Sequence, residues 1–305
     1  MNLAILPAGP LFALAAAILW GGGDFSGAMG AKHAGGTMRS ALRVVLLSHI
    51  TSFTVLVVIA NLRGDSFPHG APLAWGLAAG VTGGLSLTAF YIALARGAMG
   101  ASAAISGLLA AAIPAAVSIA QEGSPGLLHI AGFLIAGIAI WMIAAGPNPE
   151  NTAEEPEQGS SNTLTLAILS GIGFGIYFVA LKYAGHAGVI WPMATARIGS
   201  LTTCSLVLLA VTLGKISPEN RPAGTPLFPR TAILWCFSTA LLDTSGNMLF
   251  IAATRAGRLD IAAVLASLYP ATTILLAAWT LHEKPTRRQG LGMAVAAAAV
   301  VMITL

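Results

Sequence analysis

Charged side chains are scarce in this sequence: Asp, Glu, Lys and Arg together make up only 9% of its 305 residues. Soluble domains carry about 25% charged residues, so the composition excludes a water-exposed globular domain. Cysteine is nearly absent, and Cys204 and Cys236 lack the spacing of a metal or redox motif. No basic cluster alternates with exposed aromatic residues, which argues against nucleic acid as a partner.

Motifs for nucleotides and cofactors are also missing. The sequence contains no Gly-x-x-x-x-Gly-Lys-Ser/Thr stretch, so we do not expect this chain to hydrolyse ATP. We expect neither a metal, nor a cofactor, nor enzymatic activity. No basic segment precedes the first apolar run, and we expect that run to be retained as a membrane span rather than cleaved as a signal peptide.

Long apolar stretches dominate what is present, since 56% of the residues are hydrophobic. A helix needs about 20 apolar residues to cross a hydrocarbon core of about 30 Å. Backbone in lipid must satisfy its own hydrogen bonds, which favours helices. The candidate windows are Leu11–Ala31, Arg43–Ala60, Leu73–Ala95, Gly97–Gln121, Leu127–Gly146, Leu164–Leu181, Ile190–Leu213, Ala232–Thr254, Ile261–Leu281 and Gly290–Leu305. We predict an all-α integral membrane protein with ten transmembrane helices.

The windows fall into two sets of five, separated by an acidic segment. This segment, GPNPENTAEEPEQGSSN (Gly146–Asn162), holds four glutamates and no basic residue. Its Pro, Gly, Ser and Glu content is typical of a disordered tether. Because five is odd, the second set must start on the opposite side of the bilayer. We predict a first five-helix repeat over residues 1–146, an acidic linker over 147–163, and an inverted second repeat over 164–305.

Local similarities support the duplication. FYIALARG (Phe90–Gly97) ends the third window, and FIAATRAG (Phe250–Gly257) ends the eighth. Each is followed by a small-residue window with an internal proline, Pro114 or Pro270. The second of these prolines should kink its helix.

The chain resembles the EamA-type, ten-helix branch of the drug/metabolite transporter superfamily. The resemblance rests on WGGGDF (Trp20–Phe25), on Arg43 and Arg197 near the starts of the second and seventh windows, and on two longer stretches. These stretches are DTSGNMLFIAATRAG (Asp243–Gly257) and VLASLYPATTILLAAWTLHEKPTRRQGLGM (Val264–Met293). One departure is Gln121-Glu122-Gly123, where the family more usually has Gly-Glu-basic.

The resemblance implies two inverted EamA repeats around a cavity lined mainly by the first, third, fourth, sixth, eighth and ninth spans. It also implies a secondary transporter of the plasma or inner membrane, which exports or exchanges a small-molecule substrate by alternating access. Coupling to protons, and a monomer or a homodimer in the lipid bilayer, are compatible with it.

The sidedness of the termini stays open. Loops on the side of the termini carry four basic residues and loops on the other side carry nine. The former are Arg63, Lys182, Arg255 and Arg258, and the latter are Lys32, Arg39, Arg96, Lys215, Arg221, Arg230, Lys284, Arg287 and Arg288. The positive-inside rule would place both termini outside, whereas the resembling family is commonly drawn with cytoplasmic termini.

Asp24 is the first candidate site residue, because it lies within an apolar window. A charge at the bilayer centre costs about 2.5–3.5 kcal/mol on insertion scales, so intramembrane acids are functional by default. The carboxylate would face a cavity and bind substrate or a proton. Alternatively, it makes a structural hydrogen bond to a neighbouring helix that Gly21, Gly22 and Gly23 allow to approach.

Asp243 and Asn247 form a second candidate, on one face of the eighth window at i, i+4 spacing. They would form a polar wall of the cavity or lock two helices together. Trp20, near the middle of its window, and the tyrosines Tyr91, Tyr177 and Tyr269, whose windows line the cavity in the family, complete the predicted substrate path. Core packing is the alternative for each aromatic residue.

Arg43 and Arg197 occupy matching places, each near an end of its window. We expect them to anchor at the membrane interface or to form an ion pair between helices, with anion binding as a further option. For His49, inside the second window, we expect packing and hydrogen bonding rather than a proton relay.

An intramembrane protease and a membrane scaffold are the two alternative classes of function. Gly21-Gly22-Gly23-Asp24 fits the Gly-x-Gly-Asp pattern of intramembrane aspartyl proteases, with Asp243 as the second acid. The order of the acids is reversed relative to those proteases, however, and no Pro-Ala-Leu segment follows Asp243. A non-transporting membrane scaffold would leave both intramembrane acids unexplained.

Overall fold

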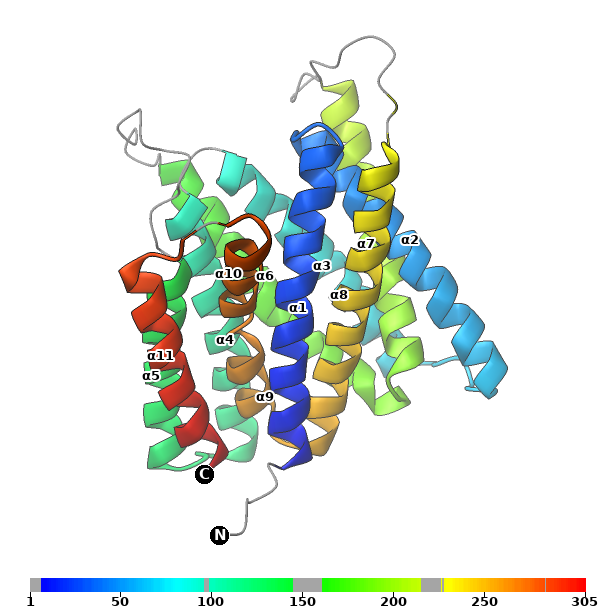
Figure 1. Ribbon diagram of the computed structural model, residues 1–305. Helices are drawn as coiled ribbons and strands as arrows, with labels where there is room; N and C mark the ends of the chain where they lie inside the picture. The colour runs from blue at the N-terminus through cyan, green and yellow to red at the C-terminus, as the bar shows by residue number, and fades with distance from the viewer. Residues whose placement is uncertain (1–6, 96–98, 145–160, 215–225, 227, 283) are drawn as a thin grey trace.

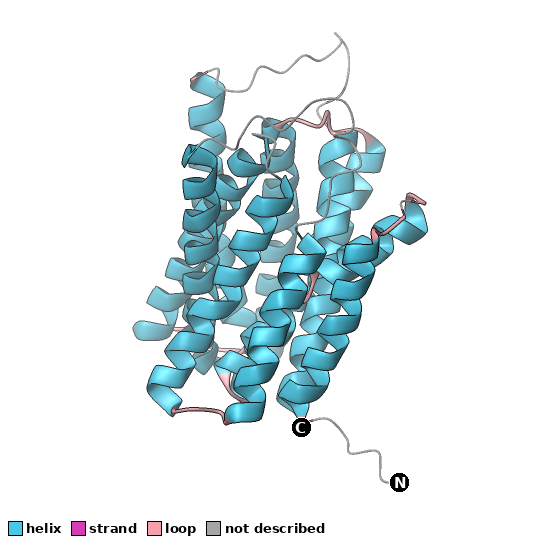
Figure 2. Ribbon diagram, turned by 90° about the vertical axis from the view of Figure 1, so that its left-hand side faces the viewer, coloured by secondary structure: helices cyan, strands magenta, loops and turns pink. Residues whose placement is uncertain are grey.

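The computed structural model describes residues 7–95, 99–144, 161–214, 226, 228–282 and 284–305, and every regular element among them is helical (Figure 2). The elements are α1 (Ala8–His33), α2 (Met38–Arg63), α3 (Ala71–Ala95), α4 (Met99–Glu122), α5 (Leu127–Ala144), α6 (Ser161–Ala184), the 3₁₀ helix η1 (Gly185–Ala187), α7 (Ile190–Leu213), α8 (Arg230–Ala256), α9 (Leu259–Ala266), α10 (Pro270–Thr280) and α11 (Arg287–Thr304).

Ten of these segments have the length of a membrane span. Eight described segments are long and apolar enough to cross a membrane, and one of them, Leu259–Thr280, comprises both α9 and α10. The remaining long helices, α8 and α11, bring the number to ten. The predicted all-α membrane fold is therefore confirmed.

The two halves are inverted relative to one another. Helix α1 begins at the end of the bundle where α11 finishes, and α6 begins at the opposite end (Figure 1). Helix α1 packs along α8, and its counterpart α6 packs along α3. The pairs α2 with α7, α4 with α9, and α5 with α11 each map onto themselves when the halves are exchanged. The exact limits of the repeats stay a prediction, because most of the linker lies outside the described residues.

Short polar residues set the helix starts that follow tight turns. Thr37 Oγ1 accepts a hydrogen bond from the Ser40 amide at 3.1 Å at the start of α2, and Ser40 returns the contact. Thr286 and Gln289 form the same reciprocal cap at the start of α11. Such capping boxes satisfy amide groups that the first helical turn leaves without partners.

Glycine brings α3 and α7 into backbone contact. A methyl group built on Gly80 would overlap the carbonyl oxygen of Ala196 and lie 2.7 Å from the Ser200 amide nitrogen. From the other side, a methyl group on Gly199 would lie 2.9 Å from the Gly80 Cα. In lipid, where apolar surface alone does not draw helices together, such close approach is a main source of helix association.

We therefore predict that Gly80→Ala lowers the free energy of unfolding by about 1–3 kcal/mol, because the two backbones must separate. Gly27→Ala is the matched control, because the nearest atoms to its added methyl group are 3.7 Å away on Thr239. That change should be neutral or stabilise the helix by about 0.5–1 kcal/mol. Unfolding of both variants in detergent checks the prediction, and equal effects would contradict it.

The matching prolines have different consequences. Helix α4 continues through Pro114, whereas the ninth span stops at Ala266 and resumes at Pro270. The predicted kink at Pro270 is thus present as a complete break. Its 3₁₀-type hydrogen bonds include Tyr269 N to the Ala266 carbonyl at 3.3 Å, and the break places Tyr269 at the centre of the bundle.

Candidate functional site

A cavity of about 150 Å³ lies between the two halves, near the middle of the spans. It is lined by Trp20, Asp24, His49, Gly80, Gly83, Leu87, Ser106, Gly107, Ala110, Phe174, Tyr177, Phe178, Met193, Ala196, Arg197, Ser200, Asp243, Asn247 and Tyr269. Besides the six spans that the family resemblance implied, α2 contributes His49, and α7 contributes residues that include Arg197.

The structure brings six of the seven predicted site residues to this one cavity. These are Trp20, Asp24, Tyr177, Asp243, Asn247 and Tyr269. The side chain of Tyr91, the seventh, lies outside the described residues. These six residues line a single mid-membrane chamber. Their role in binding substrate stays a prediction.

Aromatic side chains form one wall of the cavity. The Trp20 ring stacks on Phe178 with centroids 5.2 Å apart and lies edge-on to Tyr269 at 6.4 Å. Phe250 packs behind them, 4.8 Å from Phe178. A methyl group on Gly246 would lie 2.6 Å from the Trp20 ring, so the absence of a side chain at this glycine allows the indole to lie against α8.

Asp24 faces this cavity from α1, one helical turn after Trp20. Its residue surface is exposed although the neighbouring Gly23 and Phe25 are buried, because the carboxylate points into the chamber. A methyl group on Gly23 would lie 3.2 Å from the Asp243 amide nitrogen, so the glycines do bring α8 close. Within the described part of the chain, however, the Asp24 carboxylate has neither a hydrogen bond nor an ion pair.

Asp243, in contrast, is fully engaged. Its Oδ2 forms an ion pair with the Arg197 guanidinium, and its Oδ1 accepts a hydrogen bond from Asn247 Nδ2 at 3.1 Å. Asn247 Oδ1 in turn accepts one from the Tyr177 hydroxyl at 2.6 Å. Both interpretations of Asp243 and Asn247 therefore describe real features: they line the cavity, and they also tie α8 to α6 and α7.

The expectation that Arg197 anchors at the membrane interface is wrong. The side chain is only 4% exposed and lies behind Asp243 in the centre of the bundle, which is the interhelical ion pair given as the other option. Its guanidinium also donates to Thr244 Oγ1 at 3.0 Å. Arg43, at the matching place in the first half, is half-buried and lines a separate pocket with Phe228.

His49 completes the buried network, as a packed, hydrogen-bonded residue. Its Nε2 lies 2.9 Å from Arg197 Nη1 and its Nδ1 lies 3.0 Å from Ser200 Oγ. Because arginine only donates, Nε2 must accept, and the neutral ring then donates from Nδ1 to Ser200. The position of His49 within a predicted span indicated packing, but only the fold shows that its ring accepts a hydrogen bond from Arg197.

Comparison with known proteins agrees with this architecture. Residues 161–305 match the model of the EamA-like transporter family. This half of the chain belongs to the EamA-like transporter family. A crystal structure of a protein with 17% sequence identity aligns with 99% of this chain and 99% of its own length, with a TM-score of 0.69. No curated protein sequence matches the chain.

The whole-chain alignment shows that the first half completes the same fold. The resemblance to the EamA-type transporters is thus confirmed over residues 161–305, and the family match indicates a membrane transporter of small molecules. The cavity between the two halves is concave, mostly apolar and partly polar, as sites for small molecules usually are.

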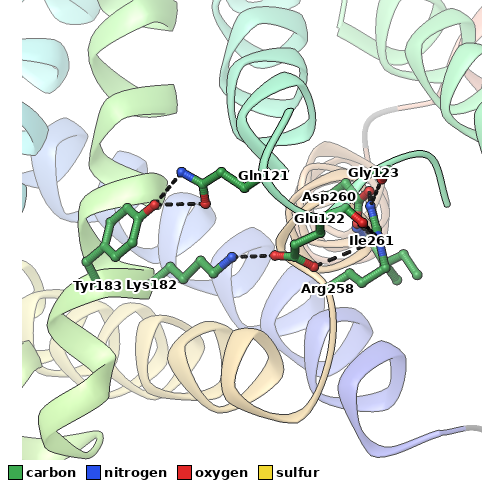
Figure 3. Close-up of polar contacts among 8 residues, drawn as sticks. All are labelled: Gln121, Glu122, Gly123, Lys182, Tyr183, Arg258, Asp260 and Ile261. Atoms are coloured by element: carbon green, nitrogen blue, oxygen red, sulfur yellow. Dashed lines mark hydrogen bonds and ion pairs between the residues drawn. The ribbon is translucent and has the colours of Figure 1, made fainter. Parts of the chain in front are cut away.

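A second polar cluster, drawn in Figure 3, lies at the end of the bundle where α1 begins and α11 finishes, which we call the terminal face. Lys182 at the end of α6 pairs with Glu122 at the end of α4 at 2.6 Å. Arg258, before α9, lies 3.9 Å from Glu122 and 2.8 Å from the fully buried Asp260. Its hydrogen bonds to Asp260 raise the pKa of Arg258 above its ordinary value.

We call the cluster of Gln121, Glu122, Lys182, Tyr183, Arg258 and Asp260 the terminal-face network. Gln121 Nε2 lies 2.6 Å from the Tyr183 hydroxyl, and Arg258 Nη2 donates to the Gly123 carbonyl at 2.7 Å. The Gln121-Glu122-Gly123 turn lacks the family's basic residue, and the cations that face it come from the other half, Lys182 from the end of α6 and Arg258 from the segment before α9. The pairs that Glu122 makes with these cations could not be named from the sequence, because the partners are far apart in the chain.

Proposed function

We propose that the chain is a secondary transporter that exports or exchanges a small metabolite by alternating access, with Asp24 as the group that carries the coupled proton. The observation that carries the proposal is the carboxylate of Asp24, which faces a mid-membrane cavity between two inverted halves and has no partner among the described residues. An intramembrane acid needs a proton, a cation or a hydrogen-bond donor to offset the cost of its charge.

The groups around Asp24 leave that role to it alone. Asp243 is held by Arg197 and Asn247, and His49 accepts from Arg197. The hydroxyls of Tyr177 and Tyr269 are the other titratable groups among the described residues that line the cavity. The same geometry disfavours a protease, because a catalytic pair of acids must share a proton, whereas here one acid is committed to an arginine.

Closure at the terminal face supports alternating access. Phe250 lies about two turns beyond Asp243, towards the terminal-face end of α8, and packs on Phe178 beneath the cavity. Helix α9, on this side of the break, is buried at seven of its eight residues, whereas α10, on the other side, has no fully buried residue. The bundle is thus packed more tightly between the cavity and the terminal face.

The terminal-face network consists of contacts that can form and break as the terminal face closes and opens. Its ion pairs between the two halves are partly exposed, with 15% exposure for the Lys182 side chain, 25% for that of Arg258 and 32% for that of Glu122. Surface ion pairs of this kind contribute about 0–1 kcal/mol each. Such contacts would hold the two halves together when the terminal face is closed, and they are weak enough to let the halves separate.

The proton-carrying role of Asp24 predicts a large loss on replacement. Proteoliposomes would be loaded with L-phenylalanine, 2-phenylethylamine, glucose and uridine, and efflux followed by mass spectrometry under an imposed pH gradient. We expect the wild-type chain to release at least one solute faster than protein-free vesicles and to respond to the gradient. Asp24→Asn should slow that release by about tenfold or more, which corresponds to about 1.4 kcal/mol, and should remove the response.

Asp65→Asn is the matched control, since Asp65 pairs with Arg63 at 3.3 Å outside the cavity. This variant should transport like the wild-type chain and keep its response to pH. Efflux that is equally fast and equally pH-dependent in the Asp24→Asn vesicles would contradict the proposed role.

A further inference from the structure

We propose that the substrate is an organic cation, an amine or quaternary ammonium with an apolar body and no carboxylate, whose charged group pairs with Asp24. This inference rests on the proposed transport function and adds the chemical class of the substrate. The structure distinguishes the groups that a ligand in the cavity can reach from those that it cannot.

The reachable charges in the cavity are acidic. Asp24 is exposed into the chamber and has no partner among the described residues, and Asp243 is 33% exposed there. Arg197, the cation that lines the cavity, is 4% exposed and sits behind Asp243. A ligand therefore meets carboxylate oxygens first, because Nη1 and Nη2 of Arg197 already donate within the protein and its Nε is buried.

Among the described residues that line the cavity, none offers an exposed cation to an anionic group on the ligand. Arg197 donates to Asp243, Thr244 and His49, and His49 is held as an acceptor on the side that faces the arginine. A carboxylate entering the cavity would have to displace Asp243 from its ion pair, which would leave a second acid uncompensated. Zwitterionic amino acids and carboxylic acids are disfavoured for this reason.

The aromatic wall suits the same class of ligand. Trp20 and Asp24 are one turn apart on the same face of α1, so a cation paired with the carboxylate lies beside the indole. Phe174, Tyr177, Phe178 and Tyr269 line the rest of the chamber. Ring faces attract cations electrostatically, with tryptophan the strongest, and they also bury an apolar body.

Three ligands with the same phenylethyl body test the inference: 2-phenylethylamine (a cation), L-phenylalanine (a zwitterion) and 3-phenylpropionate (an anion). Binding of each to the purified full chain in detergent would be measured by calorimetry at pH 7. We expect the amine to bind about tenfold or more tightly than either carboxylate. Asp24→Asn should weaken amine binding by a similar factor, and Asp65→Asn should leave it unchanged.

Counterflow of the same ligands in proteoliposomes separates this inference from the proposed function. Selective binding of the amine without exchange of any ligand would support the substrate class and overturn transport. Preferred binding and exchange of L-phenylalanine or 3-phenylpropionate would overturn the substrate class and support transport. The substrate class also fails if none of the three ligands binds, or if Asp24→Asn binds the amine as well as the wild-type chain does.

Discussion

Replacing Arg197 by methionine should lower the free energy of unfolding by about 3–5 kcal/mol, because it leaves the Asp243 carboxylate without its counter-charge inside the bundle. The substitution also removes the donor to His49 Nε2 and to Thr244 Oγ1. Methionine has a similar length, so a cavity is not the main cause of the loss. Thermal unfolding in detergent, followed by intrinsic fluorescence, would measure it.

The double variant Arg197→Met with Asp243→Asn identifies the cause. Once residue 243 is neutral, the loss of Arg197 no longer leaves a carboxylate without its counter-charge, and we expect more than half of the lost stability to return. Arg39→Met is the control, since Arg39 donates to the backbone carbonyl of Val211 at 3.1 Å and should cost about 1 kcal/mol. A double variant that is no more stable than Arg197→Met alone would show that the ion pair is not responsible.

The scaffold was predictable from the sequence because lipid leaves few alternatives. Long uncharged windows must be helices, an odd number of spans per unit must invert the second unit, and glycine spacing marks close helix contacts. Gly76, Gly80 and Gly84 have this spacing in the sequence, and the structure places Gly80 against α7. The break before Pro270 also follows from local chemistry, although the continuity of α4 through Pro114 shows that a proline alone does not decide between a kink and a break.

The buried position of the Arg197 side chain could not be predicted, because it depends on which side chains the fold places next to it. Arg43 and Arg197 occupy similar places in their spans, and snorkelling to the interface is available to any arginine near a helix end. Only the second half supplies Asp243 on the adjacent helix α8, so only Arg197 turns inward. The glycine contacts show the same asymmetry: Gly23 faces Asp243, whereas Gly173 faces Ser86 and Thr82.

The cavity's polarity follows from that asymmetry. The two matching helices line the cavity differently: α8 presents the paired acid Asp243, whereas α3 contributes Gly80, Gly83 and Leu87. The sequence identified each intramembrane acid as a candidate, but the charge that a ligand meets is decided by pairing. Asp243 is largely neutralised by Arg197, and Asp24 is left as the uncompensated group of the chamber.

A tether across the terminal face should stop transport completely. Gln121 and Tyr183 belong to opposite halves, and their side chains are hydrogen-bonded at 2.6 Å. In a chain with Cys204→Ala and Cys236→Ala, cysteines at both positions would be joined by a reducible bis-methanethiosulfonate reagent. If the halves must separate at this face in each cycle, we expect efflux of the four-solute mixture to fall to that of protein-free vesicles.

Reduction of the tether shows whether efflux was lost because the two halves were joined or because the protein was damaged. A dithiol should restore efflux to the rate of the untreated double-cysteine chain, because the bundle itself is unchanged by the reagent. Each single-cysteine variant, treated in the same way, should keep its activity, since one attached thiol does not join α4 to α6. If the tethered chain transports at the untreated rate, the terminal face does not open during the cycle, and alternating access through it is wrong.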